Sequence, residues 1–458
     1  MVQLASPKLT KKTIEKPVEF ADVLGRIESR QATIAIMGMG YVGFPLAIAT
    51  HKQGFSVIAF DIDEKKVSSL NNGKSYIKTI ADSDVGAMVE EGRFYATSAA
   101  EKLKDADVLI MCVPTPLTKN REPDLSFVEN TTKVIASQLR CGQLVVLEST
   151  TYPSTTAEVL KPMLEGTGLV CGYDFYLAYS PEREDPGNEI YSTHSIPKVV
   201  GADDEKSRNL AVALYSNIVS KAVPVSSAAT AEAVKLTENI FRSVNIALVN
   251  ELKMVFAKMD IDVWEVIEAA KTKPFGFMPF YPGPGVGGHC IPIDPFYLTW
   301  KSREFEMPTR FIELAGQINA KMPDYVIDNL RLGMDKFLQK GLNGANILML
   351  GIAYKKDVDD MRESPAMIIF ERLLGFGAHV DYHDNFVPVI PPTREHKNLA
   401  GIKSVELNAK TIKKYDAVVI ATDHSNVDYN MVVDSGVLVV DTRNVTAEFR
   451  NRKNIIRT

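Results

Sequence analysis

The stretch Thr33-Ile34-Ala35-Ile36-Met37-Gly38-Met39-Gly40-Tyr41-Val42-Gly43 decides the fold of the first half of the chain. Its first five residues are typical of a short buried strand, and residues 44–53 that follow predict a helix. A second predicted strand, residues 55–60, leads to Asp61, which lies 18 residues after Gly43. A strand, a G-x-G-x-x-G turn, a helix, a strand and then an acid together predict a dinucleotide-binding β-α-β unit.

The residues of the glycine turn have separate predicted roles. Gly38 makes the tight turn, Gly40 lets a pyrophosphate approach the backbone, and Gly43 lets the helix pack closely on the strand. Tyr41 and Val42 lie between these glycines and are predicted to belong to the same cofactor-binding turn. The phosphates are expected at the positive end of the helix that follows.

The acidic residue after the second strand indicates which cofactor binds. A carboxylate at Asp61 accepts hydrogen bonds from the ribose hydroxyls and repels a 2′-phosphate, so the pattern predicts NAD rather than NADP. Lys65 and Lys66 lie nearby and weaken this preference slightly, and Lys66 is a candidate cofactor contact.

Further strands follow at the spacing of an α/β domain, over residues 106–113, 143–148, 175–179 and 197–201. Ligands of open parallel sheets bind at the carboxyl ends of the strands. Polar residues follow these strands, and the candidates for cofactor or substrate contacts are Thr115, Thr150, Glu182 and Arg183. Any one of them is more often a helix cap, but several beside one dinucleotide site favour a functional role as much as a cap.

The middle of the chain predicts one long helix over residues 228–259, without internal proline or glycine. Apolar residues recur at three- and four-residue steps and are predicted to form a buried stripe of Val234, Phe241, Val244, Leu248, Leu252 and Val255. About 32 residues span roughly 48 Å, a length that suits a bridge between domains or a contact with a partner subunit. Lys235 and Asn239 share one face, either as a solvated face or as part of a site.

Residues 282–295 read Pro-Gly-Pro-Gly-Val-Gly-Gly-His-Cys-Ile-Pro-Ile-Asp-Pro. Proline removes backbone donors and glycine permits backbone angles that other residues avoid, so neither helix nor strand is expected here. Such a constrained loop would present Cys290, preceded by residues of little bulk and followed by Asp294, as a nucleophile. The remaining cysteines are predicted to be small buried apolar residues, namely Cys112, Cys141 and Cys171.

The last third predicts a second α/β domain. A helical stretch from about residue 308 to 340 precedes strands at residues 345–351, 378–384, 416–422 and 437–441, with a helix at 363–376. The turn Gly351-Ile352-Ala353-Tyr354 has no glycine fingerprint, so a second dinucleotide cofactor is not expected. Cations follow the first and last strands and would suit a diphosphate: Lys355, Lys356, Arg362 and Arg443.

The whole chain of 458 residues therefore predicts an α/β protein with two Rossmann-like doubly wound domains, joined by a long central helix in a helical middle region. The predicted parts are an N-terminal extension (1–30), an NAD-binding domain (31–226), a helical dimerisation domain with the cysteine loop (227–340) and a second Rossmann-like domain (341–458). A net charge of −5 does not favour nucleic acid or an anionic membrane as partner. The cysteine spacing predicts no metal site, and the absence of long apolar runs and of a signal-peptide pattern predicts a cytoplasmic protein.

The order of these motifs resembles the nucleotide-sugar 6-dehydrogenases, the UDP-glucose/GDP-mannose dehydrogenase family. The resemblance covers about residues 33 to 445 and rests on residues 38–43, 113–116 (Val-Pro-Thr-Pro), 180–183 (Ser-Pro-Glu-Arg), 235–239, 287–295 and 355–365. Gly-Gly-His-Cys after Pro-Gly-Pro-Gly, together with Ser-Pro-Glu-Arg, is most similar to the UDP-N-acetylhexosamine branch.

This resemblance implies a four-electron oxidation of the C6 hydroxyl of a UDP-N-acetylhexosamine, UDP-N-acetylglucosamine first, for surface polysaccharide synthesis. UDP-glucose and GDP-mannose are the alternative substrates. It implies that Cys290 forms a thiohemiacetal and then a thioester, that Lys235 and Asn239 stabilise the oxyanion, and that Glu182 is the general base of hydrolysis. Asp294 and Thr115 would position a water or relay a proton.

The resemblance also implies where the ligands bind. Lys355 and Arg443 should contact the UDP-sugar, with Glu182, Arg183, Lys235 and Asn239 also near it, and Arg362 should reach the cofactor phosphates of its own or a neighbouring subunit. The long helix would be the core of a homodimer or of a larger homo-oligomer. Many relatives carry an arginine about sixteen residues before the cysteine, which reaches the substrate site of the partner subunit. This chain has no arginine there, so either Lys273 takes its place or the diphosphate is held otherwise.

Two other functions fit part of the sequence. A two-electron hydroxyacid dehydrogenase would carry a similar lysine-bearing helix, but it would leave Cys290 and the third domain unexplained. A binding protein gated by NAD would keep the glycines and Asp61, but it would have no use for Cys290, Lys235, Asn239 and Asp294 together.

Overall fold

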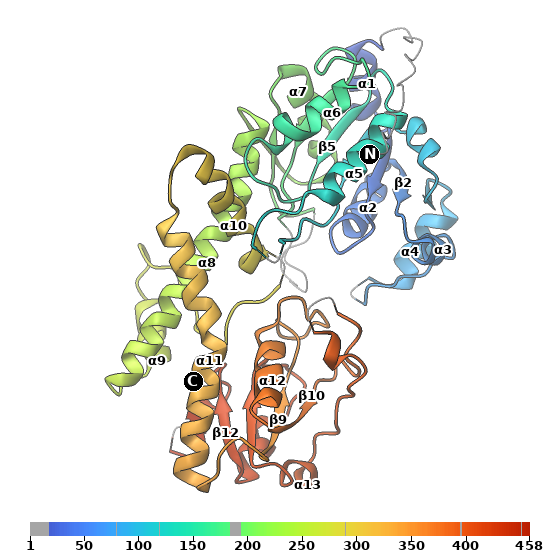
Figure 1. Ribbon diagram of the computed structural model, residues 1–458. Coiled ribbons are helices and arrows are strands. Elements are labelled where there is room, and N and C mark those ends of the chain that lie inside the picture. The colour runs from blue at the N-terminus through green and yellow to red at the C-terminus, as the bar shows by residue number, and fades with distance from the viewer. Residues whose placement is uncertain are drawn as a thin grey trace, which may run out of the picture. The chain divides into compact units, whose positions relative to one another are not determined.

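The computed structural model describes residues 18–78, 80–118, 120–183, 194–288, 290–393, 396–449 and 451–458 (Figure 1). The chain forms two compact units, one up to Glu238 and the other from Asn239 onward. The predicted boundaries at residues 30, 226 and 340 stay predictions. None of the helices in these described ranges is long and apolar enough to cross a membrane.

The first unit contains an eight-stranded sheet in the order β3-β2-β1-β4-β5-β6-β7-β8. The strands are β1 (Thr33–Met37), β2 (Ser56–Phe60), β3 (Phe94–Thr97), β4 (Val108–Met111), β5 (Leu144–Leu147), β6 (Tyr176–Tyr179), β7 (Lys198–Gly201) and β8 (Ala222–Val225). Neighbours pair parallel except β6 and β7. In this Rossmann order, β1 lies at the point where the strand order reverses, and ligands bind outside the carboxyl ends of the strands there.

Helices enclose this sheet because its strands are apolar on both faces. In β1, Ile34 and Ile36 belong to one core cluster and Ala35 and Met37 to another, since successive side chains point to opposite faces. The helical segments of the first unit are α1 (Phe20–Glu28), α2 (Gly43–Lys52), α3 (Glu64–Asn71), α4 (Asp82–Glu90), η1 (Ala100–Asp105), α5 (Ser126–Gln138), η2 (Thr156–Leu160), α6 (Lys161–Glu165) and α7 (Glu205–Ile218).

The second unit contains a five-stranded parallel sheet in the order β10-β9-β11-β12-β13. Its strands are β9 (Asn346–Leu350), β10 (His379–His383), β11 (Ala417–Ile420), β12 (Leu438–Asp441) and β13 (Ile455–Arg457). Its helical segments are α9 (Val263–Ala270), α10 (Cys290–Ser302), η3 (Arg303–Phe305), α11 (Arg310–Leu338), α12 (Pro365–Gly375), η4 (Lys397–Leu399), α13 (Ala409–Ile412), α14 (Tyr429–Asp434) and η5 (Ala447–Phe449). Gly333 of α11 lies directly against Ile456 of β13, so this helix packs on the sheet.

The predicted fold class is confirmed, with two Rossmann-like parallel sheets and a helical middle region. The long helix α8 runs from Ala228 to Lys258, close to the predicted range. The strands β3, β8 and β13 were not predicted from the sequence. They are only three or four residues long, and β8 contains Pro224, which argues against a strand in a sequence pattern.

The predicted buried stripe of α8 is only partly covered in this chain, since Val234, Val244 and Leu252 are half-buried and the other three residues are exposed. Phe241, Leu248 and Val255 are 48%, 52% and 48% exposed, although they follow one another at seven-residue intervals on one face of the helix. The periodicity correctly identified an apolar face. It could not show that the folded chain leaves this face uncovered.

Candidate active site

The turn after β1 has the backbone that its glycines predict. Gly38 has φ of 97°, and a Cβ there would lie 2.6 Å from the carbonyl oxygen of Cys112. A Cβ on Gly43 would overlap the carbonyl oxygen of Gly38, so α2 starts in direct contact with the end of the strand. At Gly40, by contrast, a Cβ would meet no described atom within 4 Å. The backbone of Gly40 thus faces open space, which fits the approach of a pyrophosphate.

Helix α2 begins directly after Tyr41 and Val42, and its first turn contains no acidic residue. The positive end of the helix dipole therefore favours an anion at this turn. The Tyr76 hydroxyl donates a hydrogen bond of 2.6 Å to the carbonyl oxygen of Met39 and so stabilises the glycine turn. Sequence reasoning missed Tyr76, because no pattern links it to a turn 37 residues earlier.

Asp61 lies at the end of β2 and is 7% exposed. Its Oδ2 accepts hydrogen bonds from the Met39 N–H at 2.9 Å and from Lys66 Nζ at 3.1 Å, and its Oδ1 accepts from the Asp63 N–H at 2.9 Å. The carboxylate thus fixes the glycine turn, and Oδ1, which accepts one bond, keeps capacity for a ribose hydroxyl. Lys66 pairs with this carboxylate, and its contact with a cofactor stays a prediction.

The threonines after β4 and β5 lie on loops that are tied together. The Ser149 hydroxyl accepts a hydrogen bond of 3.0 Å from the Val113 N–H and donates one of 2.7 Å to the Val113 carbonyl. Thr115 is buried and Thr150 is half-buried on these two neighbouring loops. Both candidates therefore lie at the carboxyl edge of the sheet, where β4 and β5 pair.

Glu232 of α8 organises the segment that follows Thr150. Its carboxylate accepts hydrogen bonds from the Ser154 N–H at 2.5 Å, from the Thr156 N–H at 2.9 Å and from the Thr156 hydroxyl at 2.7 Å. Burial raises the pKa of Glu232 to about 7, and these donors lower it in part. Sequence reasoning missed this residue, because nothing in its local sequence distinguishes it from an ordinary helix glutamate.

The loop after β6 is attached to α8 by two ion pairs. Lys235 Nζ lies 3.1 Å from Glu182 Oε2 and donates a hydrogen bond of 2.5 Å to the Glu182 carbonyl oxygen. Arg183 forms the second pair with Glu238, through Nε at 3.3 Å and a shorter contact of its terminal nitrogen. The structure therefore brings together the predicted base and the predicted oxyanion cation. The substrate contact of Arg183 stays a prediction.

Cys290 is the first residue of α10, so the expectation that no helix crosses residues 282–295 is wrong. The first four N–H groups of a helix have no partner within it, so Pro292 removes no hydrogen bond there. Pro295 removes one, near the start of the helix. The loop therefore extends only to the glycine pair Gly287-Gly288, and His289 lies outside the described residues.

Helix α10 places Asp294 one turn after Cys290, on the same face. Asp294 is 1% exposed, and its Oδ2 accepts a hydrogen bond of 2.6 Å from the Asn239 amide. Cys290 is half-buried at the positive end of the helix dipole, a position that stabilises a thiolate. Three of the predicted catalytic residues, Asn239, Cys290 and Asp294, are therefore gathered by α8 and α10 in the second unit.

The other cysteines do not share this environment. Cys112 and Cys141 are buried, as predicted. Cys171 is only partly buried, so the prediction of a buried residue holds less well for it. Burial, and then Asp204, raise the pKa of Cys171 to about 12, which keeps this thiol protonated.

The loop before Cys290 needs its glycines because it runs against the segment that follows β9. A Cβ on Gly287 would lie 2.6 Å from Tyr354 Cβ, and a Cβ on Gly288 would lie 3.0 Å from the ring of the same tyrosine. The Gly288 N–H donates a hydrogen bond of 2.9 Å to the Arg362 carbonyl. The cysteine loop is therefore held by the segment that carries Lys355 and Arg362.

The cations of the second unit include Arg443, predicted to contact the substrate, and Arg362, predicted to contact the cofactor, which follow β12 and β9. Arg443 is part-buried, and its Nε donates a hydrogen bond of 2.9 Å to the Ala421 carbonyl. The Arg362 guanidinium pairs with Asp360 through contacts of 2.6 and 3.0 Å, and its side chain is 46% exposed. Lys273 lies with its ammonium 5.0 Å from the ring centre of Phe275. The contacts of these cations with a ligand stay predictions.

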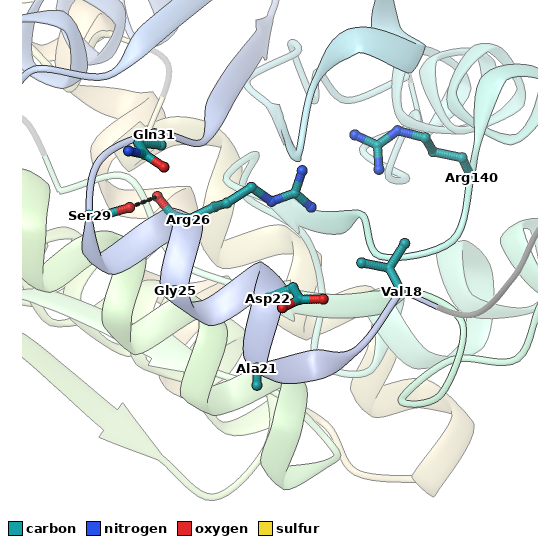
Figure 2. Close-up of a pocket in the computed structure, with 8 residues that line it drawn as sticks. All are labelled: Val18, Ala21, Asp22, Gly25, Arg26, Ser29, Gln31 and Arg140. Carbon is teal, nitrogen blue, oxygen red and sulfur yellow. Dashed lines mark hydrogen bonds between the residues drawn. The ribbon is translucent and has the colours of Figure 1, made fainter.

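A hollow beside α1 contains none of the predicted site residues (Figure 2). Figure 2 shows the guanidinium groups of Arg26 and Arg140 extending toward each other across it. Both bind Asp107 Oδ1, at 2.9 and 3.0 Å, and Asp107 directly precedes β4. This hollow is therefore at the amino ends of the strands, opposite to the edge where ligands bind in such sheets. Arg26 thus links α1 to the residue that precedes β4, and Arg140 binds the same carboxylate.

Three family models match the chain. They describe the NAD binding domain (residues 32–219), the central domain (229–321) and the UDP binding domain (348–448) of the UDP-glucose/GDP-mannose dehydrogenase family. Protein CapL of Staphylococcus aureus is 36% identical over 415 residues, which cover 88% of this chain and 94% of that protein. The UDP-N-acetyl-D-glucosamine 6-dehydrogenase of Pseudomonas aeruginosa is 34% identical over 394 residues, 86% of this chain and 90% of that protein. A solved structure of a UDP-D-ManNAc dehydrogenase from Pyrococcus horikoshii matches with a TM-score of 0.81 and 34% identity, over 90% of this chain and 95% of that one.

Proposed function

The chain belongs to the UDP-glucose/GDP-mannose dehydrogenase family and is an NAD-dependent UDP-sugar dehydrogenase, and from this premise we propose that it oxidises the C6 hydroxyl of UDP-N-acetylglucosamine to a carboxylate. The observation that carries this proposal is the arrangement of Cys290, Asp294 and Asn239 on α10 and α8. A dehydrogenase that stops after one oxidation has no use for a thiol in this position. The product would be a nucleotide-linked uronic acid for surface polysaccharides, and we propose that it is made in the cytoplasm.

The proposed reaction removes four electrons from C6. The first oxidation converts the alcohol to an aldehyde, and the Cys290 thiolate adds to its carbon to give a thiohemiacetal. The second oxidation gives a thioester, and water then hydrolyses it to the carboxylate and the free thiol. Each oxidation would use its own NAD molecule as hydride acceptor, so two NAD molecules are reduced per sugar, and the residues that would hold the cofactor are Gly38, Gly40, Gly43 and Asp61.

Lys235 and Asn239 would stabilise the negative charge that develops on the C6 oxygen. Each already donates to an acidic partner, Lys235 to Glu182 and Asn239 to Asp294. An ammonium carries three hydrogens and an amide nitrogen two, so each residue can donate a further hydrogen bond to an oxyanion. The acidic partners suit the proton transfers, with Glu182 as the base that activates the hydrolytic water and Asp294, with Thr115, positioning that water or relaying its proton.

A substrate panel tests the proposed sugar. Gly-Gly-His-Cys and Ser-Pro-Glu-Arg, and the likeness to the Pseudomonas aeruginosa enzyme, support UDP-N-acetylglucosamine. The purified protein should show its highest kcat/KM on this sugar when UDP-N-acetylmannosamine, UDP-glucose and GDP-mannose are compared with it. A higher value on another nucleotide sugar would change the assigned substrate, and activity restricted to free hydroxy acids would contradict the proposal.

The variant Asp61→Asn tests how the cofactor is chosen. Loss of the negative charge should lower the ratio of kcat/KM with NAD to kcat/KM with NADP by about tenfold, since about 1.4 kcal/mol of repulsion corresponds to that factor. Asp63→Asn is the control, because it makes the same chemical change on an exposed residue two positions later. An unchanged ratio in Asp61→Asn would mean that Asp61 does not contact the ribose.

We also propose that the exposed stripe of α8 is the core of a homodimer. Phe241, Leu248 and Val255 present about half of their surfaces on one face of this helix, and contiguous apolar surface of this kind marks interaction sites. Light scattering should give a dimer for the unmodified protein and a monomer for Leu248→Glu, since a carboxylate buried in an apolar contact costs several kcal/mol. Leu374→Glu, an exposed leucine of α12, should stay dimeric. A monomeric unmodified protein would contradict the dimer.

A further inference from the structure

Lys253 is a buried cation that the proposed chemistry does not use. It lies on α8 and is 4% exposed, and its Nζ has no hydrogen-bond partner among the residues that the structure describes. A helix lysine normally extends its ammonium into water. An ammonium kept from water without a partner costs several kcal/mol, so Lys253 is costly to the folded protein unless something else binds it.

The charges that face Lys253 do not supply that partner. They belong to Asp441 and Arg443. The Asp441 carboxylate is already engaged, because its Oδ1 accepts from the Arg443 N–H at 2.9 Å and its Oδ2 accepts from the N–H and hydroxyl of Thr446 at 2.8 and 2.7 Å. Burial lowers the pKa of Lys253 to about 7, with Asp441 raising it and Arg443 lowering it. No acidic side chain among the described residues accepts a hydrogen bond from the Lys253 ammonium.

The turn of α8 just before Lys253 contacts the segment that leads to Cys290. Asn250, almost one turn earlier on α8, accepts a hydrogen bond of 3.0 Å from the Gly283 N–H and donates one of 3.0 Å to Asn319. Gly283 in turn faces Arg443, because a Cβ on Gly283 would lie 2.9 Å from a terminal nitrogen of that guanidinium. Helix α8, the segment before Cys290 and the part-buried Arg443 are therefore connected beside the buried Lys253.

We propose that Lys253 binds the diphosphate of the nucleotide sugar together with Arg443. The inference rests on the proposed function, in which Arg443 contacts the UDP-sugar. A diphosphate carries two negative charges and several acceptor oxygens, so it would supply the missing partner of Lys253 and offset the repulsion between the two cations. Lys253 lies in the matched central domain and Arg443 in the matched UDP binding domain, so one ligand would join the two.

The variant Lys253→Met tests this role, because methionine keeps most of the length of the side chain and removes the charge. UDP affinity, measured by titration calorimetry on the full chain, should fall about 10- to 100-fold, the range expected for a lost hydrogen bond to a charged group. Uridine affinity, measured by ligand-observed NMR, should stay within about twofold. The KM for the nucleotide sugar should rise with the UDP dissociation constant, while kcat at saturation changes little.

Two further measurements separate binding from a structural role. The melting temperature of Lys253→Met should equal or exceed that of the unmodified protein, because removal of an unpaired buried charge relieves its desolvation cost. Lys258→Met, on the exposed end of the same helix, is the matched control and should change none of these quantities. If the methionine variant does not fold, Lys253→Gln carries the same test.

Three results would overturn the inference or its premise. Unchanged UDP affinity in Lys253→Met would remove Lys253 from the diphosphate site. Equal losses of UDP and uridine affinity would mean that the substitution distorts the nucleoside site instead. If the unmodified protein binds neither UDP nor a nucleotide sugar, the proposed function itself fails, and this result is seen before any variant is made.

Discussion

Replacement of Cys290 by serine is expected to lower the rate of uronic acid formation by about 10³-fold or more, the scale of effect seen when a covalent nucleophile is removed. The Cys290 thiol lies half-buried at the start of α10, where the helix dipole stabilises a thiolate. A serine hydroxyl stays protonated near neutral pH and adds poorly to an aldehyde. The variant should therefore release at most one NADH per sugar, which stopped assays of aldehyde and acid would measure.

The control for this variant is Cys171→Ser. Cys171 is also partly buried, but its thiol stays protonated because burial raises its pKa to about 12. The same atom change there should leave kcat and the yield of acid unchanged. Complete oxidation to the acid by Cys290→Ser would refute the thioester mechanism.

The variant Asn239→Ala should lower kcat by about 10²- to 10³-fold, the usual effect of removing one oxyanion donor. Asn239 donates to the buried Asp294 at 2.6 Å, so its amide is held in a fixed orientation one turn after Lys235 on α8. Donors fixed before the reaction stabilise the developing charge without reorganisation. The loss should appear in kcat at saturating substrate, with a change of KM of only a few-fold.

Two comparisons make this prediction specific. Asn329→Ala on α11 removes an amide that donates to the Tyr325 carbonyl of its own helix, and it should keep full kcat. If Asn239 and Asp294 act as a unit, the double variant should raise the activation free energy by less than the sum of the increases in the two single variants. A kcat of Asn239→Ala within threefold of the unmodified enzyme would exclude an oxyanion role.

The sequence predicted the glycine turn well because its physics is local. Gly38 has a positive φ, and Gly43 lies against the carbonyl oxygen of Gly38 five residues earlier, so both requirements follow from the strand-turn-helix pattern itself. The same holds for Cys290 and Asp294, whose spacing of four residues places them on one helix face once that helix forms. The sequence did not predict that helix α10 forms, because prolines near the start of the helix are also typical of a loop.

Contacts between distant segments account for what the sequence could not predict. Glu232 binds a loop 76 residues earlier, and Lys253 faces residues that lie almost 190 positions later. Neither has a local sequence signature, since a glutamate or lysine on a helix is usually solvated. The exposed face of α8 was predicted as buried for a related reason, because periodicity shows which face is apolar but not what covers it.

The number of NADH molecules formed per UDP-N-acetylglucosamine consumed, with excess NAD and the reaction run to completion, tests the four-electron oxidation most directly. The proposed mechanism predicts two, because the aldehyde is trapped on Cys290 and oxidised again before release. A value of one would mean that the reaction stops at the aldehyde, and it would leave Cys290 without a catalytic role.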